Sequence, residues 1–223
     1  MKGAALLLGG VALAAVLSCH DNVGPGACFE SNAQAYPFWY GTDTGLIFHW
    51  PPSYNPVRVY AEPTGELPAD VANAMALWAG AFRCRELTLT VATDSTHADI
   101  IVRNPPTIPA VRLPFMHEMH ADSVLACTGV TQFFTSSDST ALVGPMRSYV
   151  APYPGYDSAT IASCYHFVVA HELGHALGIL AESPDTGDLM YPVPYHLYLT
   201  EDDRYTIQLL YHTPSRVGPP PRQ

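Results

Sequence analysis

The sequence predicts an α+β fold, because all the short strand-like runs come before residue 151 and the helical patterns that carry the candidate site come after it. The chain has 223 residues, which corresponds to one domain at the usual ~100–200 residues per domain. Its formal net charge is −10. An acidic chain repels phosphate backbones, which argues against nucleic acid as a partner. We expect the protein to act as a monomer.

Short apolar or alternating runs bounded by turn residues predict the strands of this fold. They are Leu46–Trp50, Val57–Tyr60, Leu87–Val91, Asp99–Val102, Thr128–Phe134 and Arg147–Val150.

Three segments have the pattern of helices. Apolar residues recur every three or four positions over 67–83. A longer helix is predicted over 158–180, with Asp157 or Ser158 as its N-cap. The last helix is predicted over 200–212. It opens with Thr-Glu-Asp-Asp, which supplies a cap and places acidic side chains at the positive end of the helix.

The remaining segments define the domain organisation. Residues 45–216 are expected to form the folded domain, with 19–44 as a polar tether before it and 217–223 as a Pro-rich disordered tail. Within the domain, 104–123 contains four prolines and is predicted to be an irregular surface insertion. The His-Glu-Met-His run at 117–120 is therefore interpreted as part of a surface loop rather than as a metal site.

The first 18 residues are predicted to be a signal peptide and no part of the fold. Gly3–Leu17 is an almost wholly apolar run of about 15 residues, which is short for a membrane span and right for a secretory signal. The run ends in Val-Leu-Ser-Cys, which resembles the lipobox of bacterial lipoproteins, where the cysteine is acylated after cleavage. We therefore expect an exported cell-envelope lipoprotein anchored to the membrane at Cys19, or a secreted protein if Cys19 carries no lipid.

Export also decides how the cysteines are interpreted. Of the five cysteines, Cys19 is assigned to lipidation, which leaves an even number in an oxidising compartment. Two disulfides are expected, with three possible connectivities. We favour the pairing Cys28–Cys84 with Cys127–Cys164.

The chemistry is concentrated in His171-Glu172-Leu173-Gly174-His175, inside the long predicted helix. Residues four apart lie on one helix face, so His171 and His175 can converge on one zinc ion. Glu172 lies beside them and is placed to accept a proton from a water that the zinc activates.

The residues around this motif resemble the zinc-binding stretch of the metzincin metalloproteases, in their matrixin-like branch. The run 171–192 has a glycine, Gly178, three residues after the motif and then a Leu-Met-Tyr-Pro segment similar to the Met-turn. Residues 199–211 are similar to the C-terminal helix of matrixins. The resemblance implies a mixed twisted sheet with an active-site helix, and a zinc-dependent endopeptidase acting on proteins or peptides. It also implies Glu172 as the general base and Met190 as a floor beneath the metal.

The sequence departs from that family at the third metal ligand. Metzincins usually place a third histidine three residues after the glycine, where this chain has Ala181. We predict that Glu182 takes this role, since a carboxylate binds zinc and its long side chain tolerates a shift of one residue. The alternatives are the absence of a third protein ligand, or a ligand from Asp185, His196 or Glu201.

The missing histidine also leaves a second function open. A non-catalytic surface-binding lipoprotein could keep the metzincin fold with a weakened zinc site. Calcium sites are common in the family, but no loop of this sequence has a diagnostic calcium-ligand pattern.

Overall fold

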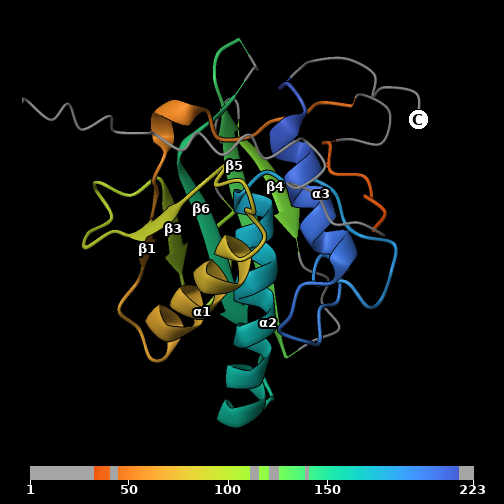
Figure 1. Ribbon diagram of the computed structural model, residues 1–223. Coiled ribbons are helices and arrows are strands. Elements are labelled where there is room, and N and C mark those ends of the chain that lie inside the picture. Colours follow the sequence, from red (N-terminus) through yellow and green to blue (C-terminus); the bar gives the residue numbers. More distant parts are fainter. Residues whose placement is uncertain (1–32, 41–44, 111–115, 121–125, 139–140, 216–223) are drawn as a thin grey trace, which may run out of the picture.

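The computed structural model describes residues 33–40, 45–110, 126–138 and 141–215, together with the backbone of 116–120. Helices α1 and α2 cross one face of a sheet, and α3 lies beside them (Figure 1). The elements are β1 (Val57–Ala61), α1 (Leu67–Ala79), β2 (Leu89–Val91), β3 (Ile100–Arg103), β4 (Met116–His120), β5 (Cys127–Thr135), β6 (Leu142–Pro152), α2 (Ser158–Ala176) and α3 (Glu201–His212).

The sheet is mixed, as the resemblance to metzincins implies. Its strand order is β2-β1-β3-β6-β5-β4. Strands β2, β1, β3 and β6 run parallel, while β5 is antiparallel to both of its neighbours, β6 and β4. The antiparallel strand β5 is also one of the two strands on which α2 packs.

Two buried tryptophans fix α2 in the core. The Trp78 indole on α1 donates to the Ala170 carbonyl at 2.8 Å, and the Trp50 indole donates to the Ala176 carbonyl at 2.9 Å. Both rings are at most 2% exposed. A buried indole N–H that lacks an acceptor costs free energy. These two hydrogen bonds therefore fix the position of α2 along its axis as well as its depth in the core.

Helix α2 ends four residues earlier than the sequence predicts. Gly178 has φ +113°, and the Gly178 and Ile179 amides donate to the His175 and Gly174 carbonyls. This is the Schellman arrangement, which ends a helix at a glycine in the left-handed region. The apolar run to Leu180 is buried and looks helical in the sequence, but its last residues have already left the helix.

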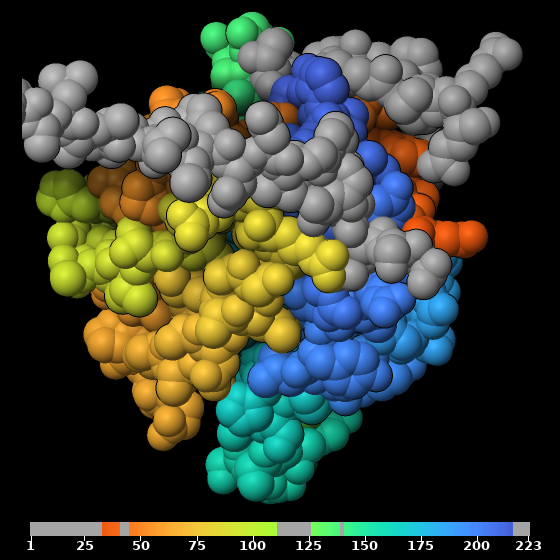
Figure 2. All heavy atoms as spheres, viewed as in Figure 1, coloured from red at the N-terminus to blue at the C-terminus, as the bar shows by residue number. Residues whose placement is uncertain are grey.

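Helix α3 begins and ends where the sequence predicts. Thr200 and Asp203 form a capping box, and the helix closes at His212. The Gln208 amide donates to the Ala81 carbonyl after α1, and the Tyr211 hydroxyl donates to the Leu177 carbonyl after α2. Helices α1 and α3 therefore lie together on the face shown in Figure 2, while the first turns of α2 (teal) project at one end.

Two predictions for the N-terminal part of the domain are wrong. Residues 46–50 form no strand, although Phe48 and Trp50 are buried; Leu46 makes a single bridge to Tyr40. The predicted tether is packed over 33–40, because its aromatic side chains enter the core of the domain. The buried aromatic residues of 33–40 are few and lie among polar, Gly and Pro residues, so the sequence shows no periodic apolar pattern there.

The predicted insertion over 104–123 is also wrong in part. Met116–His120 is strand β4, which pairs with β5 from Val130 to Phe134. All four prolines of the segment precede residue 116, so the strand itself contains none. A five-residue edge strand of mixed polarity has no strong periodic signal, because only its neighbour in the sheet specifies it.

The structure contains the predicted Cys127–Cys164 disulfide, which joins the start of β5 to α2. Cys84 is also disulfide-bonded. Its predicted partner Cys28 lies outside the described residues, as do the predicted signal peptide with Cys19 and the tail at 217–223. Within the described part of the chain, no helix has the length and apolar character needed to cross a membrane.

The end of α2 gives a stability prediction with a matched control. An added Cβ at Gly178 would lie 2.7 Å from the Phe48 carbonyl oxygen, whereas one at Gly155, also at positive φ, would meet no atom within 4 Å. Gly155→Ala should cost about 1–2 kcal/mol of unfolding free energy from backbone strain alone. Gly178→Ala should cost about 2 kcal/mol more, because backbone must move as well. Urea unfolding of the oxidised protein measures both, and equal losses would contradict the prediction.

Candidate metal centre

Helix α2 delivers two histidines to one point. His171 and His175 are fully buried, with their Nε2 atoms 3.0 Å apart. His171 Nδ1 lies 2.9 Å from the Leu189 carbonyl oxygen, and His175 Nδ1 lies 2.6 Å from that of Ile179. A carbonyl can only accept, so each Nδ1 carries a proton and each Nε2 faces the centre of the group.

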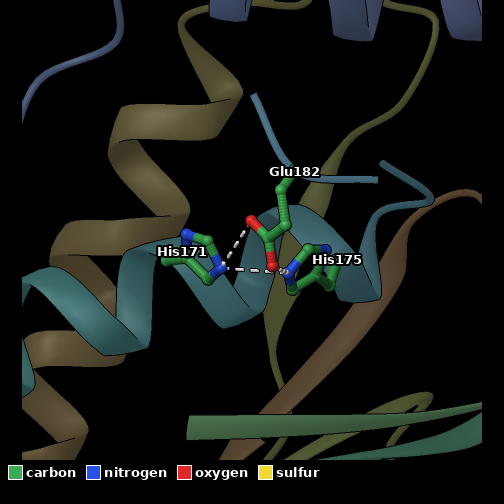
Figure 3. A group of neighbouring side chains, drawn as sticks. All are labelled: His171, His175 and Glu182. Carbon is green, nitrogen blue, oxygen red and sulfur yellow. Dashed lines mark hydrogen bonds and ion pairs between the residues drawn. The ribbon is translucent and has the colours of Figure 1, made fainter. Parts of the chain in front are cut away.

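Glu182 completes the group. The chain reverses at Gly178 and returns over the end of α2, so that the carboxylate of Glu182 points between the two imidazoles (Figure 3). Its Oε1 lies 3.3 Å from His175 Nε2, and its Oε2 lies 3.4 Å from His171 Nε2. The histidine side chains are 0% exposed and that of Glu182 is 24% exposed, so Glu182 forms the solvent-facing side of the group.

These three side chains fit a zinc ion. Tetrahedral ligands at the usual zinc distances of ~2.0–2.1 Å stand about 3.3 Å apart. The two Nε2 atoms here are 3.0 Å apart, each lies 3.3–3.4 Å from one oxygen of Glu182, and one ligand atom from each residue lies within 4.8 Å of the others. In the described part of the chain, Glu182 Oε2 is a buried oxygen without a hydrogen-bond partner. Two nitrogen lone pairs and a carboxylate that face one another repel unless a cation lies between them.

The pKa values show the same preference for positive charge. Burial lowers the pKa of His171, but the negative charge of Glu182 beside it more than offsets this and raises the pKa to about 9. Burial raises the pKa of Glu182, but the charges of His171 and His175 outweigh it and lower it to about 2. Glu182 is therefore ionised at neutral pH.

Met190 packs against this part of α2. A Cβ at Gly174 would overlap the Met190 sulfur and the Trp78 ring, so the glycine inside the histidine motif lets both side chains pack directly on the helix. Met190 is 0% exposed.

A buried carboxylate on α3 holds the turn that carries Met190. Asp203 accepts hydrogen bonds from the amides of Leu189 and Thr200, at 2.9 and 3.0 Å. Leu189 in turn accepts from His171 Nδ1 through its carbonyl. Asp203 thus orients a histidine of the group through a single intervening residue.

The segment 33–40 supports the group from the other side. The Tyr36 hydroxyl donates to Asp203 at 2.7 Å, and burial raises the pKa of Tyr36 well above its usual value. The Phe38 carbonyl accepts from the Leu180 amide at 2.9 Å, two residues before Glu182.

Glu172 is fully buried on the side of α2 that faces β5. Its Oε2 accepts from the Thr131 hydroxyl at 2.6 Å. Burial raises the pKa of Glu172, while the charges of His175 and His171 and the Thr131 hydrogen bond lower it, and the net shift is upward. A carboxylate with a raised pKa is a stronger base at neutral pH than an ordinary glutamate.

The other predicted ligands lie apart from the group. Asp185 and Glu201 are exposed, and Asp185 accepts from the Gly187 amide within its own loop. His196 stacks on Tyr198 with ring centroids 4.1 Å apart. Among the described residues, the cluster of potential metal ligands consists of His171, His175 and Glu182.

Sequence reasoning missed the residues that support the group: Thr131, Ser148, Tyr36 and the bonds of Asp203 to the Leu-Met turn. The sequence marks Asp203 as an acidic residue at the start of a helix, but helix capping alone explains an acid at that position. Its contact with the turn is therefore not predictable from the sequence. A threonine and a serine in strands, and a tyrosine in a polar segment, give no signal at all.

Comparison with known families finds a similarity. The family model described as Matrixin matches residues 115–212, from just before β4 to the end of α3. No curated protein matches the chain. The matched stretch contains the whole group of His171, His175 and Glu182. Residues 115–212 are therefore similar to a matrixin metalloprotease domain, and this similarity and the ligand group together support zinc endopeptidase activity.

Proposed function

We propose that this protein is an exported, lipid-anchored zinc endopeptidase in which His171, His175 and Glu182 hold the metal and Glu172 is the general base. The convergence of the three ligand side chains carries the proposal, since their ligand atoms lie within 4.8 Å of one another. The carbonyl contacts at Nδ1 aim the Nε2 atom of each histidine at the metal position without rearrangement. Zinc binding would displace the Nε2 proton that His171 holds at its raised pKa.

A zinc ion held by His171, His175 and Glu182 would acidify a water molecule and polarise the carbonyl of the scissile peptide bond. Glu172 accepts the proton of the attacking water and delivers it to the leaving amine. The raised pKa of Glu172 suits both steps, since the same group must first take a proton and then release it.

The position of Glu182 supports its assignment as the third ligand. Ala181 occupies the place of the third metzincin histidine and has no ligand atom. The longer glutamate side chain, one residue later, reaches both imidazoles. Its low pKa means that it needs no deprotonation at neutral pH.

The location of the protein rests on the N-terminal sequence and on the disulfides. The Cys127–Cys164 bond is consistent with an oxidising compartment. The lipobox-like Val-Leu-Ser-Cys places the acylated residue at Cys19. Substrates are then proteins or peptides met at the outer side of the membrane.

The ligand assignment predicts the effect of three substitutions on zinc affinity. Glu182→Ala should weaken binding about 100-fold or more, because only two protein ligands remain. Glu182→His should retain much of the affinity, because imidazole is a competent replacement. Asp185→Ala is the control in the same loop and should change little. Competition with a chelator measures all three, and unchanged affinity in Glu182→Ala would refute the assignment.

The catalytic assignment predicts that Glu172→Gln loses activity but not metal. Gln preserves the size and the acceptor oxygen facing Thr131 yet cannot take a proton, so cleavage of a denatured protein should fall about 10²–10⁴-fold. Zinc content should stay at one ion per chain. If the wild type carries stoichiometric zinc but cleaves no faster than Glu172→Gln, the protein is instead a metal-containing binding protein.

The anchor assignment predicts the mass of the mature protein. The membrane fraction should contain a chain that begins at Cys19 and carries acyl groups, and Cys19→Ala should abolish this form. Intact-mass spectrometry decides the question. A chain in the supernatant with an unmodified N-terminus at another residue would remove the anchor from the proposal.

A further inference from the structure

A pair of buried hydroxyls lies behind the general base. Thr131 on β5 and Ser148 on β6 are directly opposite in the sheet, and both are 0% exposed. Thr131 Oγ1 lies 2.6 Å from Glu172 Oε2, 3.0 Å from the Glu172 carbonyl oxygen and 2.9 Å from Ser148 Oγ. Neither the metal group nor the Leu-Met turn uses these hydroxyls.

Counting protons gives the direction of these bonds. The two oxygens of Glu172 that face Thr131 can only accept when the carboxylate is ionised, so the single Thr131 proton points to Glu172. Ser148 then donates to Thr131 Oγ1. A hydroxyl that accepts one hydrogen bond donates a stronger one, so Ser148 reinforces the bond to the carboxylate.

The shape of β5 restrains the same carboxylate. Residues 129 and 131 lie on one face of the strand, because side chains alternate. A Cβ at Gly129 would overlap Glu172 Oε1 and Val168 Cγ1, so glycine leaves the space that the carboxylate occupies. Strand β5 therefore offers a recess for one oxygen of Glu172 and a donor for the other.

We propose that Thr131, supported by Ser148, is a positioning residue that fixes the orientation of the Glu172 carboxylate for proton transfer. This inference rests on the proposed role of Glu172 as general base. A glutamate side chain has three rotatable bonds, and proton transfer requires its oxygen at hydrogen-bond distance from the attacking water. The Thr131 hydrogen bond and the Gly129 recess hold one rotamer before any substrate arrives.

The test compares zinc-loaded, oxidised protein carrying Thr131→Val, Thr131→Ser or Thr135→Val, with a labelled denatured protein as substrate. Thr131→Val keeps the shape of the side chain and removes its hydroxyl, so kcat should fall about 10- to 100-fold with KM within about twofold and zinc content unchanged. Thr131→Ser restores the hydroxyl and should recover kcat to within about threefold. Thr135, a buried threonine of the same strand, provides the control, and Thr135→Val should leave kcat near that of the wild type.

A second measurement does not depend on turnover. In zinc-free protein, Thr131→Val should lower the urea unfolding midpoint more in the wild-type background than in Glu172→Leu, because only the former retains a buried carboxylate that needs the hydroxyl. Equal shifts in the two backgrounds would show that Thr131 is a packing residue and overturn the inference.

The outcomes separate this inference from the function on which it rests. If Glu172→Gln cleaves at the wild-type rate, the general-base assignment fails. If Glu172→Gln is inactive while Thr131→Val matches Thr135→Val in kcat, the general base stands and the positioning role is wrong. A loss in Thr131→Val that Thr131→Ser does not recover would also overturn the positioning role.

Discussion

The buried carboxylate of Asp203 joins the parts of the structure on which the metal group depends. It accepts from the Leu189 amide, from the Thr200 amide and from the Tyr36 hydroxyl. These donors belong to the turn under the metal group, to the start of α3 and to the N-terminal segment, which are far apart in the sequence. A buried carboxylate requires several donors, so removing any of these segments would leave it unsatisfied. The need to satisfy one charge thus holds three segments together, and one of them contacts His171 directly.

The N-terminal segment shows why the donors that Asp203 needs cannot be identified from the sequence. Residues 33–40 occur in a polar stretch that resembles a tether, yet they carry Tyr36 to Asp203 and the Phe38 carbonyl to Leu180. Both contacts span more than 140 residues of sequence, and a carbonyl contact leaves no trace in side-chain identity. Helix α3, by contrast, was predictable at both ends, because a capping box is a local interaction between residues three positions apart.

The difference between local contacts and contacts distant in the sequence also explains which parts of the site could be predicted. The histidine spacing follows from helix geometry, and the Glu182 prediction follows from the absence of a ligand atom at Ala181 and the reach of the next side chain. Both arguments are local, and the structure brings Glu182 to His171 and His175. Thr131 and Ser148 approach Glu172 only through the pairing of β5 with β6 and the packing of α2 on both strands. The strand that lies beyond them, β4, was missed for the same reason, since its partner alone defines it.

A carboxylate as third ligand also changes what the general base must do. In the proposed mechanism, Glu182 would neutralise one more unit of the metal's charge than an imidazole, so a bound water would be less strongly acidified than at a site with three histidines. A less acidic water needs a stronger base, and burial supplies one by raising the pKa of Glu172. Burial alone would favour a protonated carboxyl, and the charges of His175 and His171, together with the smaller effect of the Thr131 hydrogen bond, oppose that rise in the pKa of Glu172. The departure at Ala181 and the hydroxyl pair behind Glu172 therefore both bear on the proposed proton transfer, the first through the charge of the third ligand and the second through the position of the base.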